Sequence, residues 1–285
     1  MFINDIVDEV QFSDIFLFAD DLKLFNKSEN HKLLQSDLNN ILVWSKKWQL
    51  PVSLNKSKML YIGKSNPQHS YSLDDYKLES GGRSFKYLGV YISTNLSSRI
   101  HCSNIVSKAS RISYMIHRCF VSNDVNLKVK AFKVYVRPIL EYCSNVWNSH
   151  LLCHIQNIEN VQRHFTRKLL KTDIYYTDRL SALNLESLEL RRLYFDALTA
   201  YSIINGLILD FNDFYTLPPL SSTRSGNKSL LYVPKYRLDS RKYCFALRTA
   251  KLWNSLPETV KNMNYLTFKK TLRNVDFSVF LKGHK

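Results

Sequence analysis

The sequence is organised around Ile15-Phe16-Leu17-Phe18-Ala19-Asp20-Asp21-Leu22-Lys23-Leu24-Phe25. Two short apolar runs flank the Ala-Asp-Asp step. Runs of this length, rich in Phe and Ile and bounded by polar residues, predict two buried strands. The step between them then becomes a tight hairpin turn, with Asp20 and Asp21 at its tip.

Two adjacent carboxylates point to a metal ion. They repel each other, and removing them from water costs free energy unless a cation compensates. Oxygen ligands of this kind suit Mg²⁺, which keeps several waters and accepts phosphate oxygens as further ligands. Asp20 and Asp21 are therefore the predicted metal ligands. The alternative is an ordinary surface turn, since Asp is a common turn residue that needs no metal.

Composition describes a globular chain of 285 residues in which hydrophobic residues make up 45%. No uncharged apolar run is long enough to span a membrane. Asp5, Asp8 and Glu9 give the N-terminus the wrong charge for a signal peptide. Five cysteines form no CxxC pair, which is typical of reduced intracellular thiols rather than zinc ligands. We expect an intracellular protein of the nucleus or cytoplasm, not secreted and without a membrane partner.

Positive charge is concentrated after residue 80. Residues 1–80 hold 9 Lys and Arg against 11 Asp and Glu, whereas residues 81–285 hold 31 against 13, which together give the net charge of +16. This asymmetry predicts a polyanionic partner for the second part. Aromatic residues stand among the cations, as in Arg163-His164-Phe165 and Lys235-Tyr236-Arg237, and this favours nucleic acid. A solvated basic surface without a ligand is the alternative.

The pattern after the hairpin predicts an α+β fold. An amphipathic helix is expected near residues 34–48, followed by strands at 71–78 and 85–92 that Gly81-Gly82 would join. From residue 96 the periodicity is helical. The expected architecture is a small antiparallel sheet followed by a mainly helical remainder. The expected domains are residues 1–95, 96–175 and 176–285, the last with a linker near 210–228.

Several short motifs follow one another along the chain in a characteristic order. They are Phe18-Ala19-Asp20-Asp21, Trp44-Ser45-x-x-Trp48, Leu54-Asn55-x-x-Lys58, Tyr87-Leu88-Gly89-Val90, Val136-Arg137-Pro138-x-Leu140-Glu141-Tyr142 with Val146-Trp147, Glu159-x-Val161-Gln162-Arg163 and Trp253-Asn254-x-Leu256-Pro257. Together they resemble the reverse transcriptases of non-LTR (LINE-type, jockey-like) retrotransposons. Each motif is short, but their number and order cover almost the whole chain.

The resemblance implies roles for particular residues. Asp20 would be a metal ligand in a polymerase palm, Asp21 its acidic neighbour, and Lys58 would sit near the departing pyrophosphate. The strand containing Tyr87, Leu88 and Gly89 would steady the primer end. Helices between residues 97 and 171 would form a thumb that holds the template–primer duplex by its phosphates, through Lys108, Arg111, Arg118, Arg163 and Arg167. The implied cofactor is Mg²⁺, and the implied partners are an RNA template, a DNA primer and deoxynucleoside triphosphates.

The same resemblance predicts a fragment. The family supplies another metal-binding carboxylate from an earlier strand, and a nucleotide-contacting Gln-Gly stretch after it. Neither is present, and residues 2–6 resemble the segment that follows that stretch. We therefore expect part of an RNA-directed DNA polymerase that is inactive alone, because nucleotidyl transfer needs carboxylates that hold two ions. The alternatives are a non-catalytic basic nucleic-acid-binding module and a purely structural remnant.

Overall fold

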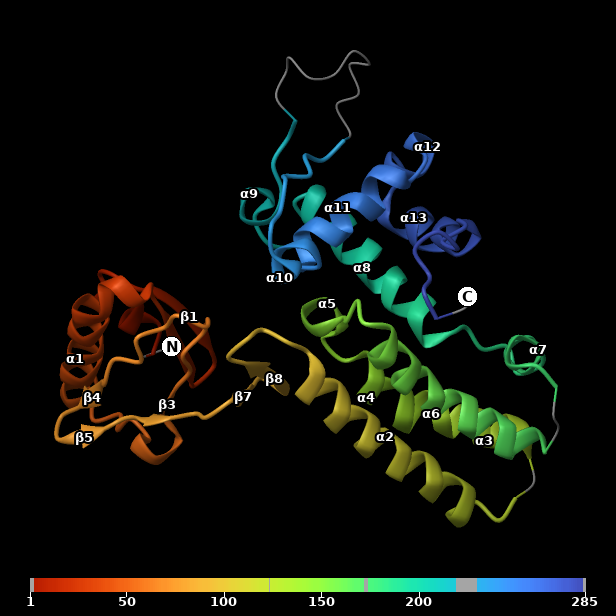
Figure 1. The fold of residues 1–285 in the computed structure, drawn as a ribbon, viewed down its shortest axis with the longest axis horizontal. Helices are drawn as coiled ribbons and strands as arrows, with labels where there is room; N and C mark the ends of the chain where they lie inside the picture. Colours follow the sequence, from red (N-terminus) through yellow and green to blue (C-terminus); the bar gives the residue numbers. More distant parts are fainter. Residues whose placement is uncertain (1–2, 123, 172–173, 219–229, 284–285) are drawn as a thin grey trace. The chain divides into compact units, whose positions relative to one another are not determined.

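The computed structural model describes residues 3–122, 124–171, 174–218 and 230–283, and it divides into two compact units, residues 1–97 and 98–285 (Figure 1). The segment expected to follow the Gln-Gly stretch begins at Phe2, which lies outside these ranges. The linker expected at 210–228 also extends beyond them, and its described part contains a short helix, α9 (Phe211–Phe214).

The first unit combines one long helix with short strands. Its elements are η1 (Asn4–Glu9), β1 (Asp14–Phe18), β2 (Asp21–Phe25), η2 (Ser28–Asn30), α1 (His31–Lys47), η3 (Leu54–Lys56), β3 (Lys58–Met59), β4 (Ser72–Leu73), β5 (Tyr76–Lys77), β6 (Glu79–Ser80), β7 (Ser84–Tyr87) and β8 (Val90–Ser93). Among the described residues the strands form four separate pairs, of which β1–β2, β4–β5 and β7–β8 are antiparallel and β3–β6 is parallel. The expectation of an α+β chain with small antiparallel sheets is met, but that of one sheet is wrong.

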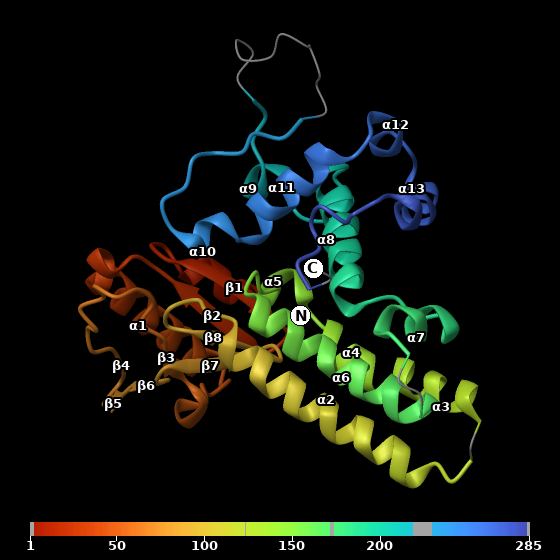
Figure 2. The ribbon, with the colours of Figure 1, turned by 45° about the vertical axis from the view of Figure 1, so that its right-hand side comes forward.

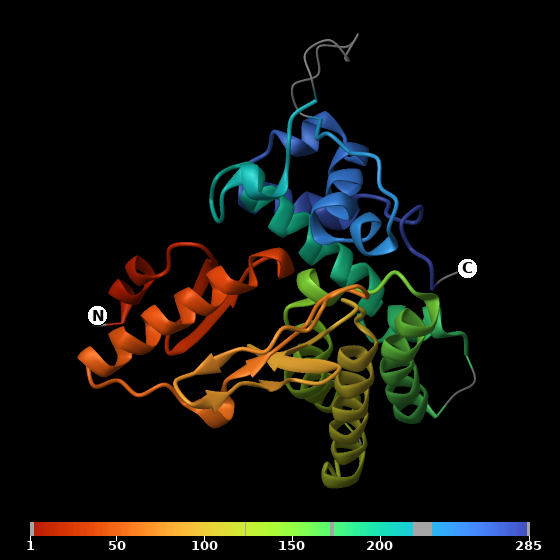
Figure 3. The same cartoon turned by 60° about the vertical axis from the view of Figure 1, so that its left-hand side comes forward.

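The predicted Asp-Asp hairpin exists, but its strands are not buried on both faces. Residues at alternate positions of β1 and β2 pack beside Ile6, Ile41 and Trp44, the last two from α1, which runs alongside the hairpin (Figure 3). The other positions face outward, so Phe16 is 51% and Phe18 62% exposed. The prediction failed because both faces carry apolar residues, which hides the period of two that a half-buried strand normally shows.

Two predicted strands in the first unit are hairpins. Residues 71–78 fold back on themselves as β4–β5, and Gly81-Gly82 connects β6 to β7, which are not paired with each other. Leu88 and Gly89 do not lie inside a strand, because they form the two-residue turn between β7 and β8, with φ of 44° and 85°. Positive φ at both positions is typical of a type I′ hairpin turn.

Helices are the regular elements of the second unit in its described part. Its elements are α2 (Arg99–Cys119), α3 (Val125–Ala131), the π-helical turn η4 (Phe132–Val136), α4 (Arg137–Glu141), α5 (Ser144–Trp147), α6 (Leu152–Leu170), α7 (Tyr176–Ala182), α8 (Leu188–Ile204), α9 (Phe211–Phe214), α10 (Asp239–Lys242), α11 (Phe245–Ser255), α12 (Glu258–Lys261), α13 (Tyr265–Thr271) and η5 (Leu272–Asn274). Helices α2 and α6 pack side by side (Figure 2). No helix in the described ranges has the length and apolarity needed to cross a membrane.

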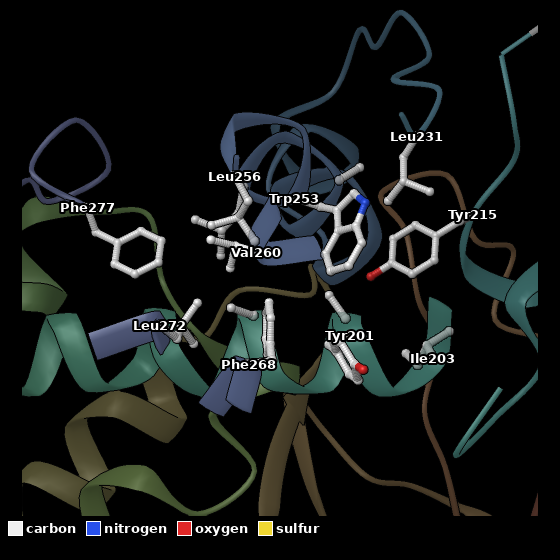
Figure 4. Packing of buried hydrophobic residues seen from close by; sticks show 14 residues of the cluster. Tyr201, Ile203, Tyr215, Leu231, Trp253, Leu256, Val260, Phe268, Leu272 and Phe277 are labelled. Atoms are coloured by element: carbon white, nitrogen blue, oxygen red, sulfur yellow. The ribbon is translucent and has the colours of Figure 1, made fainter. Parts of the chain in front are cut away.

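One core cluster of the second unit is built around aromatic rings (Figure 4). Tyr201 of α8 has its ring centroid 4.4 Å from that of Phe268 on α13 and 6.3 Å from that of Trp253 on α11. Its hydroxyl donates to the carbonyl oxygen of Met263 at 2.6 Å, so the polar end of the ring is satisfied. Phe268 is fully buried. These rings join α8, α11 and α13 into one packed body.

Candidate functional site

The two aspartates lie at the tip of the β1–β2 hairpin. Phe18 and Asp21 face each other in the strand register, so Ala19 and Asp20 form a two-residue loop. Ala19 has a φ of 53° and Asp20 does not have a positive φ, which is the pattern of a type II′ turn, where glycine is usual. An alanine in this conformation stores about 1–2 kcal/mol of backbone strain. Both aspartates are exposed, so the turn presents two carboxylates to solvent.

The base of the hairpin is held by buried and half-buried polar groups. Asp37 of α1 is 0% exposed and accepts the N–H of Gln11 at Oδ1 (3.0 Å) and that of Phe12 at Oδ2 (3.2 Å). From the other strand's end, the Asn26 amide donates to the carbonyl oxygen of Phe12 (3.0 Å) and to Oγ of Ser13 (3.1 Å). With the base fixed and one face packed on α1, the carboxylate-bearing turn is held in one orientation.

Tyr87 lies beside the outward face of this hairpin. The Lys23 ammonium is 4.6 Å from the ring centroid of Phe16 and 5.2 Å from that of Tyr87. Burial, and to a smaller extent the negative charge of Asp21, raise the pKa of Tyr87. The structure therefore brings together two residues that the sequence singled out, Asp21 and Tyr87. It adds Lys23, which sequence reasoning missed although it stands two residues after Asp21.

The donor chemistry of the turn fits Mg²⁺, which prefers carboxylate, water and phosphate oxygens. Within the described ranges no cluster of three or more His, Cys, Asp or Glu side chains could hold a metal ion. Asp14 lies on the same hairpin, but it pairs with Phe25 at the base. Four residue steps along the strand separate it from Phe18, about 13 Å at the usual rise. Asp14 therefore cannot share an ion with Asp21, and the turn offers the pair Asp20 and Asp21.

Lys58, which is predicted to lie near the departing pyrophosphate, forms an ion pair within the protein. It lies on β3 opposite Glu79 of β6, and the two side chains form an ion pair. The hydrogen bond to Glu79 raises the pKa of Lys58. Among the described hydrogen bonds and ion pairs, none joins Lys58 to the aspartate turn. Leu88 and Gly89 follow Tyr87 directly, so the three predicted primer residues share the end of the β7–β8 hairpin.

Four of the five predicted nucleic-acid cations are exposed on packed helices. Lys108, Arg111 and Arg118 stand on α2 at positions i, i+3 and i+10, which share one helix face. Arg167 is exposed on α6. These two helices pack against each other, so their cations belong to one body.

The fifth cation, Arg163, belongs to a buried network. Its guanidinium carbon lies 4.8 Å from the ring centroid of Tyr176, whose hydroxyl donates to Glu159 at 2.5 Å. Glu159 also accepts the N–H groups of Leu188 (3.1 Å) and Glu189 (3.2 Å), the first residues of α8. Burial, with the nearby charge of Glu159, raises the pKa of Tyr176. This motif therefore holds α6, α7 and α8 together.

The motif that contains Glu141, Tyr142 and Trp147 also stabilises the packing of the helical unit. Glu141 of α4 forms an ion pair with Arg191 of α8, which also contacts Glu186 at 2.9 Å. The indole N–H of Trp147 donates to the carbonyl oxygen of Tyr142 at 2.7 Å. The residues that the resemblance selects here connect segments about 50 positions apart.

Comparisons with known proteins give a family match for the segment that contains the hairpin. Residues 1–92 match the family model of reverse transcriptase (RNA-dependent DNA polymerase). The chain is 29% identical over 174 residues, 58% of its length, to the RNA-directed DNA polymerase from mobile element jockey of Drosophila funebris, of which it covers 19%. It is 25% identical over 123 residues, 42% of its length, to an uncharacterized protein of Caenorhabditis elegans, of which it covers 62%. It thus spans less than two thirds of either relative, and no solved structure matches it.

Proposed function

Residues 1–92 form a reverse transcriptase region of the non-LTR, LINE type, and from this premise we propose that the β1–β2 turn is the metal-binding corner of an RNA-directed DNA polymerase. Asp20 and Asp21 are its ion-binding carboxylates, and Tyr87, Leu88 and Gly89 contact the primer end. Bound Mg²⁺ would supply charge stabilisation for nucleotidyl transfer from a deoxynucleoside triphosphate. This nucleotidyl transfer would take place inside the cell, where an RNA template is found.

One observation carries this proposal: the carboxylate pair is exposed on a turn whose base is fixed. The buried Asp37 holds the chain that enters β1, and the strands pack on α1. An ordinary surface turn needs neither a buried anchor nor a strained alanine between its strands. The charge of Asp21 contributes to the raised pKa of Tyr87, which supports a role for this ring near that carboxylate.

We further propose that this chain alone does not extend a primer. Two-metal phosphoryl transfer requires carboxylates that clamp two ions about 3.5–4 Å apart. The turn supplies two carboxylates, and Asp14 is too far along the hairpin to add a third. A third metal-binding carboxylate would have to come from a segment outside this hairpin.

Metal binding at the turn can be tested with Tb³⁺, a luminescent ion that binds oxygen ligands and is excited through nearby tyrosines. The full chain should give tyrosine-excited Tb³⁺ emission that Mg²⁺ displaces. Asp20→Asn with Asp21→Asn should weaken this binding, whereas Tyr87→Phe should lower the emission without changing the affinity. Asp75→Asn, an exposed turn aspartate of the same unit, is the matched control. Unchanged Tb³⁺ affinity in the double variant would remove the metal site.

Polymerisation is tested by extending a DNA primer on an RNA template with Mg²⁺ and the four deoxynucleotides. We expect no extension. Extension that Asp20→Asn abolishes and Asp75→Asn preserves would refute the proposed inactivity and establish the turn as a working site.

The second candidate function is nucleic-acid binding without catalysis. The observation that favours it is charge: residues 1–97 hold 11 basic and 11 acidic residues, whereas residues 98–285 hold 29 and 13. The second unit therefore carries the whole net charge of +16. Binding through phosphates should weaken steeply as salt is added. Substituting Lys108, Arg111 and Arg118 with Gln should weaken binding and reduce that salt dependence, whereas Asp20→Asn should not.

A further inference from the structure

Two tyrosine rings of the second unit are surrounded by lysines. The Lys242 ammonium lies 5.8 Å from the ring centroid of Tyr236 and 4.9 Å from that of Tyr243. The Lys251 ammonium lies 4.7 Å from the Tyr236 centroid and donates to its hydroxyl at 3.0 Å. The Lys282 ammonium lies 5.1 Å from the Tyr243 centroid. We call these five side chains the lysine–tyrosine cluster.

Segments far apart in the sequence are fixed at this cluster. The imidazole of His150 stacks on Tyr243, with ring centroids 3.6 Å apart and planes within 6°. Lys282 donates from its ammonium to the carbonyl oxygen of His150 at 3.1 Å. The buried carboxylate of Glu189 accepts the backbone N–H groups of Lys282 and Gly283, both at 2.9 Å. The bond to His150 therefore holds the Lys282 ammonium and the bond to Tyr236 holds that of Lys251, which reduces the ordering needed when a ligand binds.

The cluster has an excess of positive charge. Lys242 shares one ring with Lys251 and the other with Lys282, so neighbouring ammonium groups lie no farther apart than about 10 Å, the Debye length at 0.1 M salt. Within the described part of the chain, none of the three lysines forms an ion pair with a carboxylate. Asp239 is the acidic residue whose charge acts on Lys242.

The surroundings strengthen this positive potential. Lys235, Arg237 and Arg241 are exposed in the same segment. The hydrogen bond from Lys251 lowers the pKa of the Tyr236 hydroxyl. Burial, and then the charge of Lys282, lower the pKa of His150. A surface that gathers cations without matching acids fits a polyanion.

We propose that the lysine–tyrosine cluster binds the phosphodiester backbone of a single nucleic-acid strand. A phosphodiester chain carries one charge per link, so one ligand can engage all three ammonium groups. Tyr236, which is 37% exposed, adds an aromatic surface on which a base can stack irrespective of sequence, whereas His150 already stacks on Tyr243. None of the residues of this site belongs to the aspartate turn or to the cations of α2 and α6. The proposal therefore goes beyond the polymerase function and does not depend on it.

The experiment compares two triple variants of the full chain by fluorescence anisotropy with a labelled single-stranded RNA across a salt series. Lys242→Gln, Lys251→Gln and Lys282→Gln together remove the cluster's ammonium groups. Each phosphate contact on a single strand contributes about 0.7 to the slope of log K against log salt, so the slope should fall by about 2 and the affinity at 0.1 M salt by about 100-fold. Lys269→Gln, Lys270→Gln and Arg273→Gln remove three exposed cations from α13 and η5 and serve as the charge-matched control.

Asp239→Asn provides a test that a folding defect cannot imitate. Removing the acid beside Lys242 should tighten binding, whereas a damaged fold can only weaken it. Equal losses in the two triple variants, or no loss in the cluster variant, would overturn the proposal. So would binding to phosphatidylserine vesicles that requires the three lysines while RNA binding does not, since the ligand would then be a lipid surface. Primer extension and Tb³⁺ binding report on the aspartate turn separately.

Discussion

Replacing Asp37 with alanine should loosen the aspartate-bearing hairpin without unfolding the chain. Asp37 is fully buried and accepts N–H groups from Gln11 and Phe12, which precede β1. A hydrogen bond to a charged group contributes about 1.5–3 kcal/mol. Because Gln11 and Phe12 are exposed, water can replace part of what is lost. We therefore expect a net cost of about 2–3 kcal/mol for the two bonds together.

Hydrogen–deuterium exchange of the full chain measures this cost locally. A loss of about 2–3 kcal/mol corresponds to roughly 30- to 150-fold faster exchange through opening, since about 1.4 kcal/mol is tenfold. The acceleration should be confined to residues 11–25 and absent from the helical unit. Asp37→Asn, which keeps one acceptor oxygen, should show a smaller effect. Asp75→Ala is the control from the β4–β5 turn. Native exchange rates across the hairpin in a folded Asp37→Ala variant would refute the anchoring role.

Three further predictions concern stability. Burial lowers the pKa of His101 to about 4, whereas the same imidazole in the unfolded chain has a pKa near 6.5 and binds a proton between these two values. The free energy of unfolding should therefore fall by up to about 3 kcal/mol as the pH drops from 6.5 to 4. His101→Gln should remove this part of the pH dependence in a series of denaturation experiments. Phe268→Ala should cost about 3–5 kcal/mol, read from tryptophan fluorescence in urea, because a fully buried ring leaves a cavity. Leu266→Ala at a 70% exposed site should cost less than about 0.5 kcal/mol. Ala19→Gly should stabilise the hairpin by about 0–1 kcal/mol in exchange experiments, since relief of the positive φ exceeds the entropy that glycine adds to the unfolded chain; slower folding or faster exchange would contradict it.

The aspartate hairpin could be predicted because its signal is local. Two five-residue strands and a two-residue loop are readable from neighbouring residues alone, and the structure has them where the pattern places them. The burial of the strands could not be read in the same way. Phe16 and Phe18 face outward while Ile15 and Leu17 face α1, and no sequence rule separates the two apolar rows.

In the Tyr87–Val90 stretch the sequence predicts a strand where the structure has a turn. Strand-forming residues stand on both sides of Leu88-Gly89, so the stretch was expected to be one strand. Gly89, with its positive φ, was the available signal for a turn. A glycine between two strand-forming segments should first be interpreted as part of a hairpin turn, and only then as a residue inside a strand that allows a close approach.

The roles of the helical motifs depend on distant residues and could not be predicted. Glu159 meets the N-terminus of α8 about 30 positions away, and Glu141 meets Arg191 at a separation of 50. Arg163 looked like an exposed cation on a basic helix, yet it packs on Tyr176. Such partnerships are fixed by tertiary packing, which a single sequence does not reveal.

The attachment of the tail to Glu189 sets different substitution rules at adjacent positions. The carboxylate binds main-chain N–H groups, so it does not discriminate among side chains at position 282. Position 283 favours glycine, because an added Cβ would lie 2.9 Å from the Glu189 carboxylate and 3.1 Å from Ile155, so the carboxylate would have to shift away from the N–H groups it accepts. Relatives that drift away from an acid at 189 should therefore lose the glycine at 283 as well. The lysine at 282 should persist only in those that still select for its charge.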